Sequence, residues 1–146
     1  MTDKTNPAAP VADRDRDILA INQAMLNSVL NGDWQAYADN CSDDISCFEA
    51  ETNGVLVEGL PFHRFYFKEG ATTNDTLDAA AVETAAAQVT MVRPHLRWLT
   101  DDVVVLSYTR LVQRQANGSF STSSCCETRI WQRHHGHWHQ VHVHRS

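Results

Sequence analysis

The C-terminal part of the chain alternates between apolar and polar side chains, which is the pattern of half-buried β-strands. This alternation predicts four long strands, at 89–100 with a break or bulge near Pro94, at 103–115, at 119–133 and at 137–145. Turn residues separate the strands at Asp101-Asp102, Asn117-Gly118 and His135-Gly136. Strands joined by such short turns predict an antiparallel meander.

Near the N-terminus the apolar residues recur at helical spacing instead. From Asp13 the stripe predicts a helix that the stop signal Asn31-Gly32 ends; its apolar members are Ile18, Ile21, Met25, Leu26, Val29 and Leu30. Asp33 then has the position of an N-cap for a short second helix that runs to about Asn40. The two helices form a hairpin with an amphipathic face that must pack on another element.

Between these parts the pattern predicts a β-hairpin and a third helix. Residues 45–51 alternate like a strand, Asn53-Gly54 is a hairpin turn signal, and residues 55–57 form the returning strand. Pro61 suits the first turn of a short buried helix that contains the aromatic residues of 62–67. Residues 70–88 are small, acidic and alanine-rich, and they fit either a surface loop or a marginal helix at 78–87.

The order of elements predicts an α+β fold with helices on one face of a strongly curved, mostly antiparallel sheet. A length of 146 residues is typical of a single domain with a real core. We expect that domain at residues 13–146, after a disordered N-terminal tail at residues 1–12, where two prolines and several alanines show no periodicity.

The unusual feature of three of the predicted strands is an arginine on the face that is expected to be buried. Apolar neighbours lie two or four residues from each of them: Leu106, Tyr108 and Val112 from Arg110, Trp131 from Arg129, and Val141 and Val143 from Arg145. Arginine is almost never fully buried without a partner. Three arginines on inward-facing strand surfaces therefore predict a concave sheet with a polar pocket of the size of a small anion.

Composition and charge exclude several classes of protein. A net charge of −6 argues against broad nucleic-acid binding. No apolar run has the length of a membrane span and the N-terminus lacks a signal pattern, so we expect a cytoplasmic protein. The four cysteines form no C-x-x-C pair, which favours structural thiols over a zinc site or a disulfide framework.

Several motifs, in this order, resemble one known family. They are N-G-D-W-Q-A-Y at 31–37, F-E-A-E at 48–51, Gly54, V-E-G-L at 57–60, F-H-R-F-Y-F at 62–67, Y-T-R-L-V-Q at 108–113, E-T-R-I-W at 127–131 and H-V-H-R-S at 142–146. Together they are similar to the association (hub) domain of calcium/calmodulin-dependent protein kinase II, over residues 13–146. That family belongs to the NTF2-like superfamily, so the resemblance implies a cone of helices wrapped by a curved sheet with a deep pocket.

The resemblance also implies a role and a set of site residues. The family's domain assembles subunits into dimers and rings, without catalysis and without a cofactor, and its pocket accepts small carboxylates. The matching positions for ligand binding here are Arg110, Arg129, Arg145, His63, Tyr37 and Glu49. We therefore expect two partners, a further copy of the chain and a carboxylate-like ligand, and neither nucleic acid nor a membrane.

Two departures from the family pattern change these expectations. The chain has no Gly-rich loop, catalytic-loop or D-F-G signature of a kinase, which indicates a stand-alone, bacterial-type version with no calmodulin partner. The segment after Phe67 is longer than the family's and lacks its tryptophan-containing loop near the pocket mouth, so the preferred ligand is expected to differ.

Other interpretations of the same residues remain open. The arginines can simply pair with internal acids, for which the candidates are Glu49, Glu51, Glu58 and Glu127. The domain can also be a pure assembly module whose pocket is a relic, or a small isomerase- or cyclase-type enzyme that uses His63 and Glu49. His63 by itself fits a pocket donor or a core histidine.

The C-terminal histidines raise the question of a metal site. Strict alternation puts His142 and His144 on one strand face and His137 and His139 on the other. Each pair lacks a third ligand, so we expect no functional metal and a solvent or subunit-interface role for this surface.

Overall fold

The structure is a computed structural model that describes residues 12–69 and 86–146. Its elements are α1 (Asp13–Leu30), α2 (Trp34–Asp39), β1 (Cys41–Phe48), the 3₁₀ helix η1 (Ala50–Thr52), β2 (Val57–Glu58), α3 (Leu60–Glu69), β3 (Ala86–Thr100), β4 (Val103–Ala116), β5 (Ser119–His134) and β6 (His137–Arg145). The predicted α+β class, the helical hairpin and the meander are confirmed.

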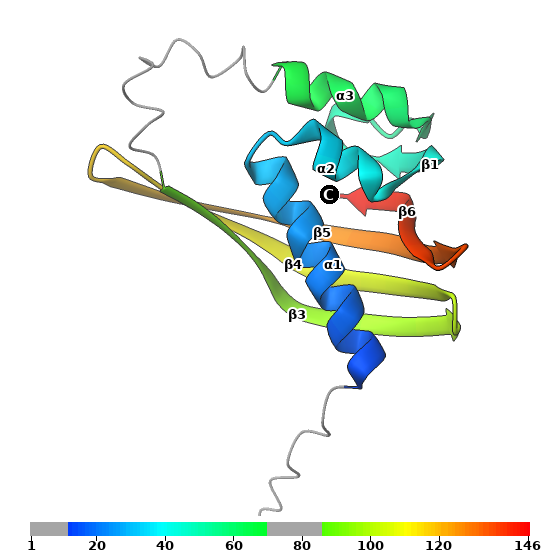
Figure 1. The fold of residues 1–146 in the computed structure, drawn as a ribbon. Coiled ribbons are helices and arrows are strands. Elements are labelled where there is room, and N and C mark those ends of the chain that lie inside the picture. The colour runs from blue at the N-terminus through cyan, green and yellow to red at the C-terminus, as the bar shows by residue number, and fades with distance from the viewer. Residues whose placement is uncertain (1–11, 70–85) are drawn as a thin grey trace, which may run out of the picture.

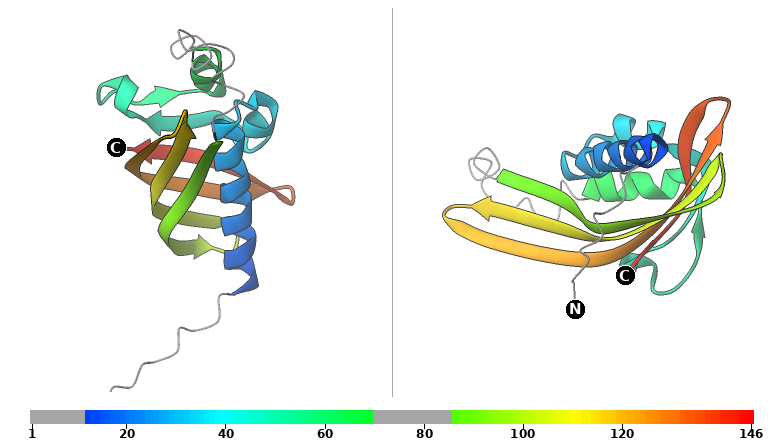
Figure 2. Two further views of the ribbon diagram at one scale, coloured as in Figure 1. Left: turned by 90° about the vertical axis from the view of Figure 1, so that its left-hand side faces the viewer. Right: turned by 90° about the horizontal axis from the view of Figure 1, so that it is seen from below.

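One curved sheet of six strands organises the fold, in the order β2-β1-β6-β5-β4-β3. All neighbouring strands are antiparallel except β1 and β6, which run parallel. The helices lie on one side of the sheet, with α1 crossing it beside β3 (Figures 1 and 2). We call the side that faces the helices the inner face and the opposite side the outer face.

Local sequence signals explain where the elements begin and end. The carboxylate of Asp33 accepts a hydrogen bond from the Ala36 amide at 3.1 Å, as expected of the N-cap of α2. At the β4–β5 turn both Asn117 (φ 51°) and Gly118 (φ 77°) adopt the left-handed backbone that a two-residue hairpin requires. Positive φ values also recur at the predicted His135-Gly136 turn.

The core lies between α1 and the inner face. Ile18 and Met25 of α1 are fully buried, and so are Leu106 of β4 and Trp131 of β5. The indole Nε1 of Trp131 donates to the side-chain oxygen of Asn22 at 3.1 Å, so a polar contact also connects α1 with the sheet. Burying these large side chains contributes roughly 1.5–3 kcal/mol each.

The predicted bounds of both strands of the first hairpin differ from those in the structure. β1 begins at Cys41 rather than at residue 45 and ends at Phe48, after which the chain turns into η1. The cause is local, because the Thr52 hydroxyl donates to the Glu49 carbonyl at 2.8 Å and closes the turn. The returning strand is then only Val57–Glu58, and Val55 is 62% exposed.

Two other expectations fall at the edges of the described residues. Of the predicted tail and the segment at 70–88, residues 1–11 and 70–85 lie outside the described part of the chain. Ala86 and Ala87 already belong to β3, so a helix at 78–87 is wrong at that end. None of the helices in the two described ranges has the length and apolar character needed to cross a membrane.

Register shifts change the direction of side chains along several strands of the sheet. The break predicted near Pro94 is confirmed by a register shift between Val92 and His95 of β3. The shift between β5 and β6 was not predicted: Ile130 pairs with His142 and Trp131 with Gln140, so Val141 is the extra residue in β6. Beyond this bulge, every side chain of β6 faces the side opposite to that expected from the alternation before it.

Candidate functional site

The inner face holds a cavity of about 130 Å³, partly open to solvent, between the helices and the sheet. Its lining residues are Val29, Tyr37, Glu49, Glu51, His63, Phe67, Arg110, Glu127, Arg129 and Arg145. All six residues that the sequence proposed for ligand binding line this one cavity. They come from α2, α3, β4, β5, β6 and the residue before η1.

Glu127 of β5 lies at the centre of the polar cluster. Its carboxylate is within 3.3 Å of the Arg110 guanidinium and 3.1 Å of the Arg129 guanidinium, and its side chain is fully buried. The Tyr108 hydroxyl donates to Oε2 at 2.5 Å. Burial by itself raises the pKa of Glu127, but the Arg129 charge and these contacts outweigh it and leave the pKa below its ordinary value.

Arg129 is the most deeply buried of the three arginines, with only 4% of the residue exposed. Its Nη1 donates to Gln140 Oε1 at 2.5 Å, and its Nε donates to the Tyr108 hydroxyl at 3.0 Å. Although burial lowers the pKa of a guanidinium, the Glu127 carboxylate outweighs it and raises the pKa of Arg129. The cation is therefore held by a complete set of partners.

Arg145 occupies a more open part of the cavity. It bonds to Glu49 at 3.3 Å and to Glu51 at 2.8 Å. The side chain of Glu49 is 10% exposed, whereas that of Glu51 is 52% exposed. Glu51 is thus the carboxylate of the cluster that solvent reaches most easily.

Tyr37 and His63 form the opposite wall. The Tyr37 hydroxyl and His63 Nδ1 are 2.8 Å apart. Burial lowers the pKa of His63 to about 4, with a further contribution from the Arg129 charge, and burial raises the pKa of Tyr37. Tyr37 therefore keeps its proton and donates to Nδ1, which leaves the hydrogen of neutral His63 on Nε2. That Nε2 atom is buried, and no described residue forms a hydrogen bond with it.

The charges of the cavity balance. Three guanidinium groups face three carboxylates, those of Glu49, Glu51 and Glu127. Three of the four candidate acids thus pair with the arginines, while Glu58 lies on the outer side of the protein. Three polar atoms nevertheless have no hydrogen-bond partner among the described residues: the donors His63 Nε2 and Arg110 Nε and the acceptor Glu127 Oε1.

The geometry does not favour the enzyme alternative. A histidine with a pKa of about 4 is a weak base at neutral pH, and Glu49 is engaged by Arg145. Neither His63 nor Glu49, the two residues of that alternative, is therefore poised as a catalytic base.

Two buried polar residues that support the site were missed in the sequence. Gln140 is fully buried and binds Arg129, but strict alternation places it on the wrong face because it precedes the bulge at Val141. Asn22 lies at helical spacing from Ile18 and Met25, within the apolar stripe of α1. A polar residue within that stripe was a signal that its side chain would need a partner.

The bulge also overturns the predicted division of the histidines. The cross-strand partners of His137, His139, His142 and His144 are His134, Gln132, Ile130 and Thr128, all on the outer face. The four histidines therefore share the outer face. The inner face of β6 carries Trp138, Gln140, Val143 and Arg145, so Val141 does not accompany Arg145.

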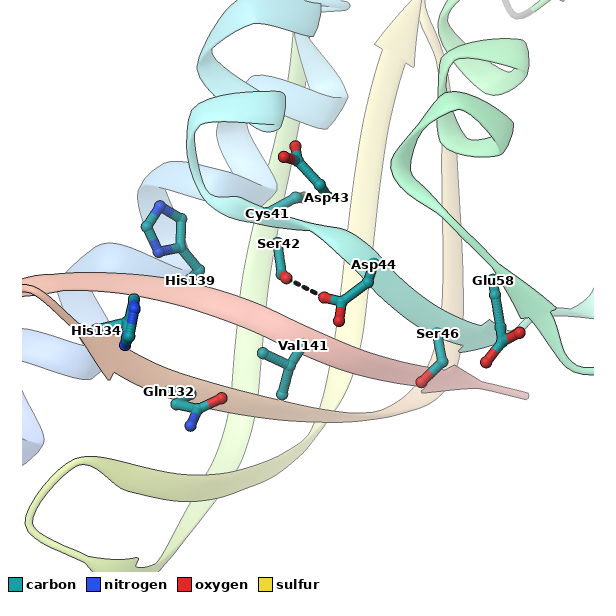
Figure 3. Close-up of a pocket in the computed structure, with 10 residues that line it drawn as sticks. All are labelled: Cys41, Ser42, Asp43, Asp44, Ser46, Glu58, Gln132, His134, His139 and Val141. Atoms are coloured by element: carbon teal, nitrogen blue, oxygen red, sulfur yellow. Dashed lines mark hydrogen bonds between the residues drawn. The ribbon is translucent and has the colours of Figure 1, made fainter.

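The outer side of the sheet also carries a shallow hollow of about 700 Å³ where β1, β5 and β6 meet (Figure 3). Its lining includes the acids Asp43, Asp44 and Glu58 and the histidines His134 and His139. In the part of the chain that the structure describes, no three histidine, cysteine, aspartate or glutamate residues are grouped so as to hold a metal ion. The hollow is polar, and it is separate from the arginine cavity on the inner face.

Comparison with known proteins gives consistent matches. A family model described as "Calcium/calmodulin dependent protein kinase II association domain" matches residues 14–146. The delta subunit of calcium/calmodulin-dependent protein kinase type II from Oryctolagus cuniculus is 33% identical over 134 residues, which cover 91% of this chain and 24% of that protein. The chain thus spans about a quarter of the length of that relative.

Solved structures that are similar to this chain include a hub domain and an NTF2-like protein. The Chlamydamonas reinhardtii CamKII hub homology domain is 38% identical, with a TM-score of 0.81, and the match covers 92% of this chain and 98% of that one. An NTF2-like protein from Cytophaga hutchinsonii is 17% identical, with a TM-score of 0.60 and coverage of 93% and 98%. At that identity the similarity shows the fold alone, which is NTF2-like.

Proposed function

The chain belongs to the calcium/calmodulin dependent protein kinase II association domain family, and from this we propose that it is a non-catalytic domain that joins copies of itself, at least into dimers, through the outer face of its sheet. The family is one of association domains, so the general role is oligomerisation. The surface and the ligand given below are the more specific parts of the proposal.

The outer face is the observation that carries this proposal. The three α-helices all lie on the inner face, so no described α-helix covers the outer face (Figure 2). Because cross-strand partners share a face and Leu106 and Arg129 point inward, their neighbours Val105 and Ile130 point outward as a pair. With them lies a band of half-buried apolar side chains: Val92, Val103 and Leu111.

A second copy is the occupant that fits this band. The band is built of β-branched and leucine side chains, which pack well between two sheets, and about 800 Å² per partner is enough for a stable dimer. The histidine row of β6 flanks the band on the same face and would lie at or near such an interface.

One substitution pair tests the surface. Val105→Glu would place a charge in the centre of the band, and we expect it to lower the mass of the assembly measured by native mass spectrometry or light scattering. Val55→Glu is the matched control, because Val55 is 62% exposed and lies outside the sheet. A monomeric wild-type protein, or an assembly that Val105→Glu leaves unchanged, would contradict the proposal.

We also propose that the cavity binds a small carboxylate through Arg110, Arg129 and Arg145, with His63, Tyr37 and Glu49 around it. The donors His63 Nε2 and Arg110 Nε, which have no partner among the described residues, support this, since a carboxylate oxygen can accept a hydrogen bond from either. The balanced charges impose a condition: the ligand must replace one of the protein's own carboxylates. Glu51 is the one best placed to leave, because its side chain is half exposed.

Calorimetry with acetate as the probe separates this proposal from the relic alternative. Binding that disappears in Arg110→Met would support a working pocket, because Arg110 is the only one of the three arginines with a buried donor left open in the described structure. No heat with the wild-type protein, after purification without carboxylate buffers, would leave only the assembly role.

A further inference from the structure

The charge balance of the arginine cavity limits the kind of ligand that it can hold. Three guanidinium groups face three carboxylates there, so these charges sum to zero. A plain carboxylate brings a fourth negative charge into a largely buried cluster, where an unpaired charge is costly. A zwitterion carries a carboxylate and an ammonium group, and it therefore leaves the charges of the cavity balanced.

The unsatisfied polar atoms of the cavity are also of both kinds. His63 Nε2 and Arg110 Nε are donors, whereas Glu127 Oε1 is an acceptor. That oxygen lies 3.3 Å from the Arg110 guanidinium as an ion pair but accepts no hydrogen bond from a described residue. A carboxylate offers only acceptors, and an ammonium group offers three donors. A ligand that carries both groups matches the cavity better than a carboxylate does.

Arg145 has donors that can hold the carboxylate of such a ligand. Its hydrogen bonds with Glu49 and Glu51 all use Nη2. Its Nε and Nη1 atoms bond to none of the described residues, and 21% of the side chain is exposed, so a ligand can reach them. Guanidinium donors form strong, charge-assisted hydrogen bonds with a carboxylate. The ligand can therefore bind here while both glutamates stay in place.

Glu51 has room for the ammonium group. Among the described residues its two oxygens accept hydrogen bonds only from Arg145 Nη2, at 3.1 and 2.8 Å. A carboxylate has about four acceptor positions, and 52% of this side chain is exposed. An ammonium group can thus bind on the open side of Glu51 while its ion pair with Arg145 remains.

The contact between Arg145 and Glu51 and the size of the cavity define the ligand further. Because the two side chains touch, the ligand must carry its two charges close together, and an α-amino acid carries both on one carbon atom. A water molecule occupies about 30 Å³ in the liquid, so a cavity of about 130 Å³ has room for about four waters. This space suits an amino acid with at most a small side chain.

We propose that the cavity binds a small α-amino acid as a zwitterion, with its carboxylate on Arg145 and its ammonium group on Glu51. This inference rests on the proposed binding of carboxylates in the cavity, and it adds the second charge of the ligand. A plain carboxylate must displace Glu51 to keep the charges balanced, whereas the zwitterion uses Glu51 as a partner.

Three small molecules test the two charges separately by calorimetry at pH 7. Glycine carries both charges, acetate lacks the ammonium group, and methylamine lacks the carboxylate. We expect glycine to bind at least about fivefold more tightly than acetate, because acetate binds only with loss of a half-exposed ion pair. Methylamine should show no binding, because its charge also upsets the balance.

The variant Glu51→Gln should change the order of these affinities. It removes the partner of the ammonium group and also the carboxylate that acetate must displace, so acetate should bind at least as tightly as glycine. Glu58→Gln is the matched control, because Glu58 lies on the outer side, and it should keep the wild-type order. Glu51 is half exposed, so its replacement leaves the core intact.

The outcomes separate this inference from the proposed function. If acetate binds to the wild-type protein and glycine binds no more tightly, the zwitterion is wrong and the carboxylate site stands. The zwitterion is also wrong if methylamine binds as tightly as glycine, or if Glu51→Gln keeps glycine ahead of acetate. If none of the three molecules binds, both proposals fall.

Discussion

Arg145 binds Glu51 at 2.8 Å across 94 positions of sequence, although half of the Glu51 side chain is exposed. The same guanidinium group reaches the nearly buried Glu49 at 3.3 Å. One arginine thus holds a fixed carboxylate and an exchangeable one. This makes the Glu51 position the place where an external carboxylate competes with the protein.

Replacing Glu51 by glutamine should therefore strengthen the binding of a small carboxylate. Removing an exposed ion pair frees up to about 1 kcal/mol, so we expect acetate to bind up to about fivefold more tightly in calorimetry. Glu58→Gln is the matched control, because Glu58 lies on the outer side. Equal or weaker binding in Glu51→Gln would show that Glu51 does not compete with the ligand.

Loss of the buried Arg129 charge should destabilise the fold. Arg129→Met leaves Glu127 without its main partner and Gln140 without a donor, and breaking a buried ion pair in this way costs about 3–5 kcal/mol. Urea unfolding measures this loss. Arg133→Met provides the comparison, since its ion pair with Asp102 is exposed and should contribute less than about 1 kcal/mol. Similar losses in the two variants would contradict the central role of Arg129.

Acid should weaken the fold through His63. Because burial lowers its pKa to about 4 in the folded protein, the unfolded chain takes up the proton first, and unfolding becomes easier as the pH falls below about 6.5. At pH 5 the loss is about 2 kcal/mol, and it stops growing below pH 4.

The check is the free energy of unfolding at pH 7 and pH 5 for the wild-type protein and for His63→Gln. All other groups titrate equally in the wild-type protein and in the variant. The free energy of unfolding of the wild-type protein should therefore fall by about 2 kcal/mol more than that of His63→Gln between pH 7 and pH 5. Parallel losses would mean that His63 is protonated as easily in the folded protein as in the unfolded chain.

Asn22 should be needed for the attachment of α1 to the sheet. Asn22→Ala leaves the buried indole N–H of Trp131 without an acceptor, which costs about 1–3 kcal/mol. In the double variant Asn22→Ala with Trp131→Phe that N–H is absent. A double-mutant cycle from thermal unfolding should therefore give a coupling between the two residues, whereas strictly additive losses would rule the contact out as a stabilising one.

Much of the fold followed from local signals in the sequence. Asp33 and Asn31-Gly32 marked the ends of the first two helices, and Asn117-Gly118 and His135-Gly136 marked two hairpins, because these residues favour caps and left-handed backbone. The resemblance then brought together six of the ten residues that line the cavity, although their positions range from Tyr37 to Arg145. The predictions were wrong where a contact that the local pattern does not contain changed the backbone. An example is the hydrogen bond from the Thr52 hydroxyl to the Glu49 carbonyl, which replaces the predicted end of the first strand by η1.

The sequence by itself therefore determined the elements, the turns and the presence of arginines on apolar strand faces, because each depends on residues that are neighbours along the chain. The tertiary structure decided which acids those arginines meet and which face the histidines share. Glu49 and Glu51 reach Arg145 only because β1 lies parallel to β6, and Gln140 reaches Arg129 only because Val141 bulges. Both depend on how distant strands align, and no pattern within a single strand contains that information.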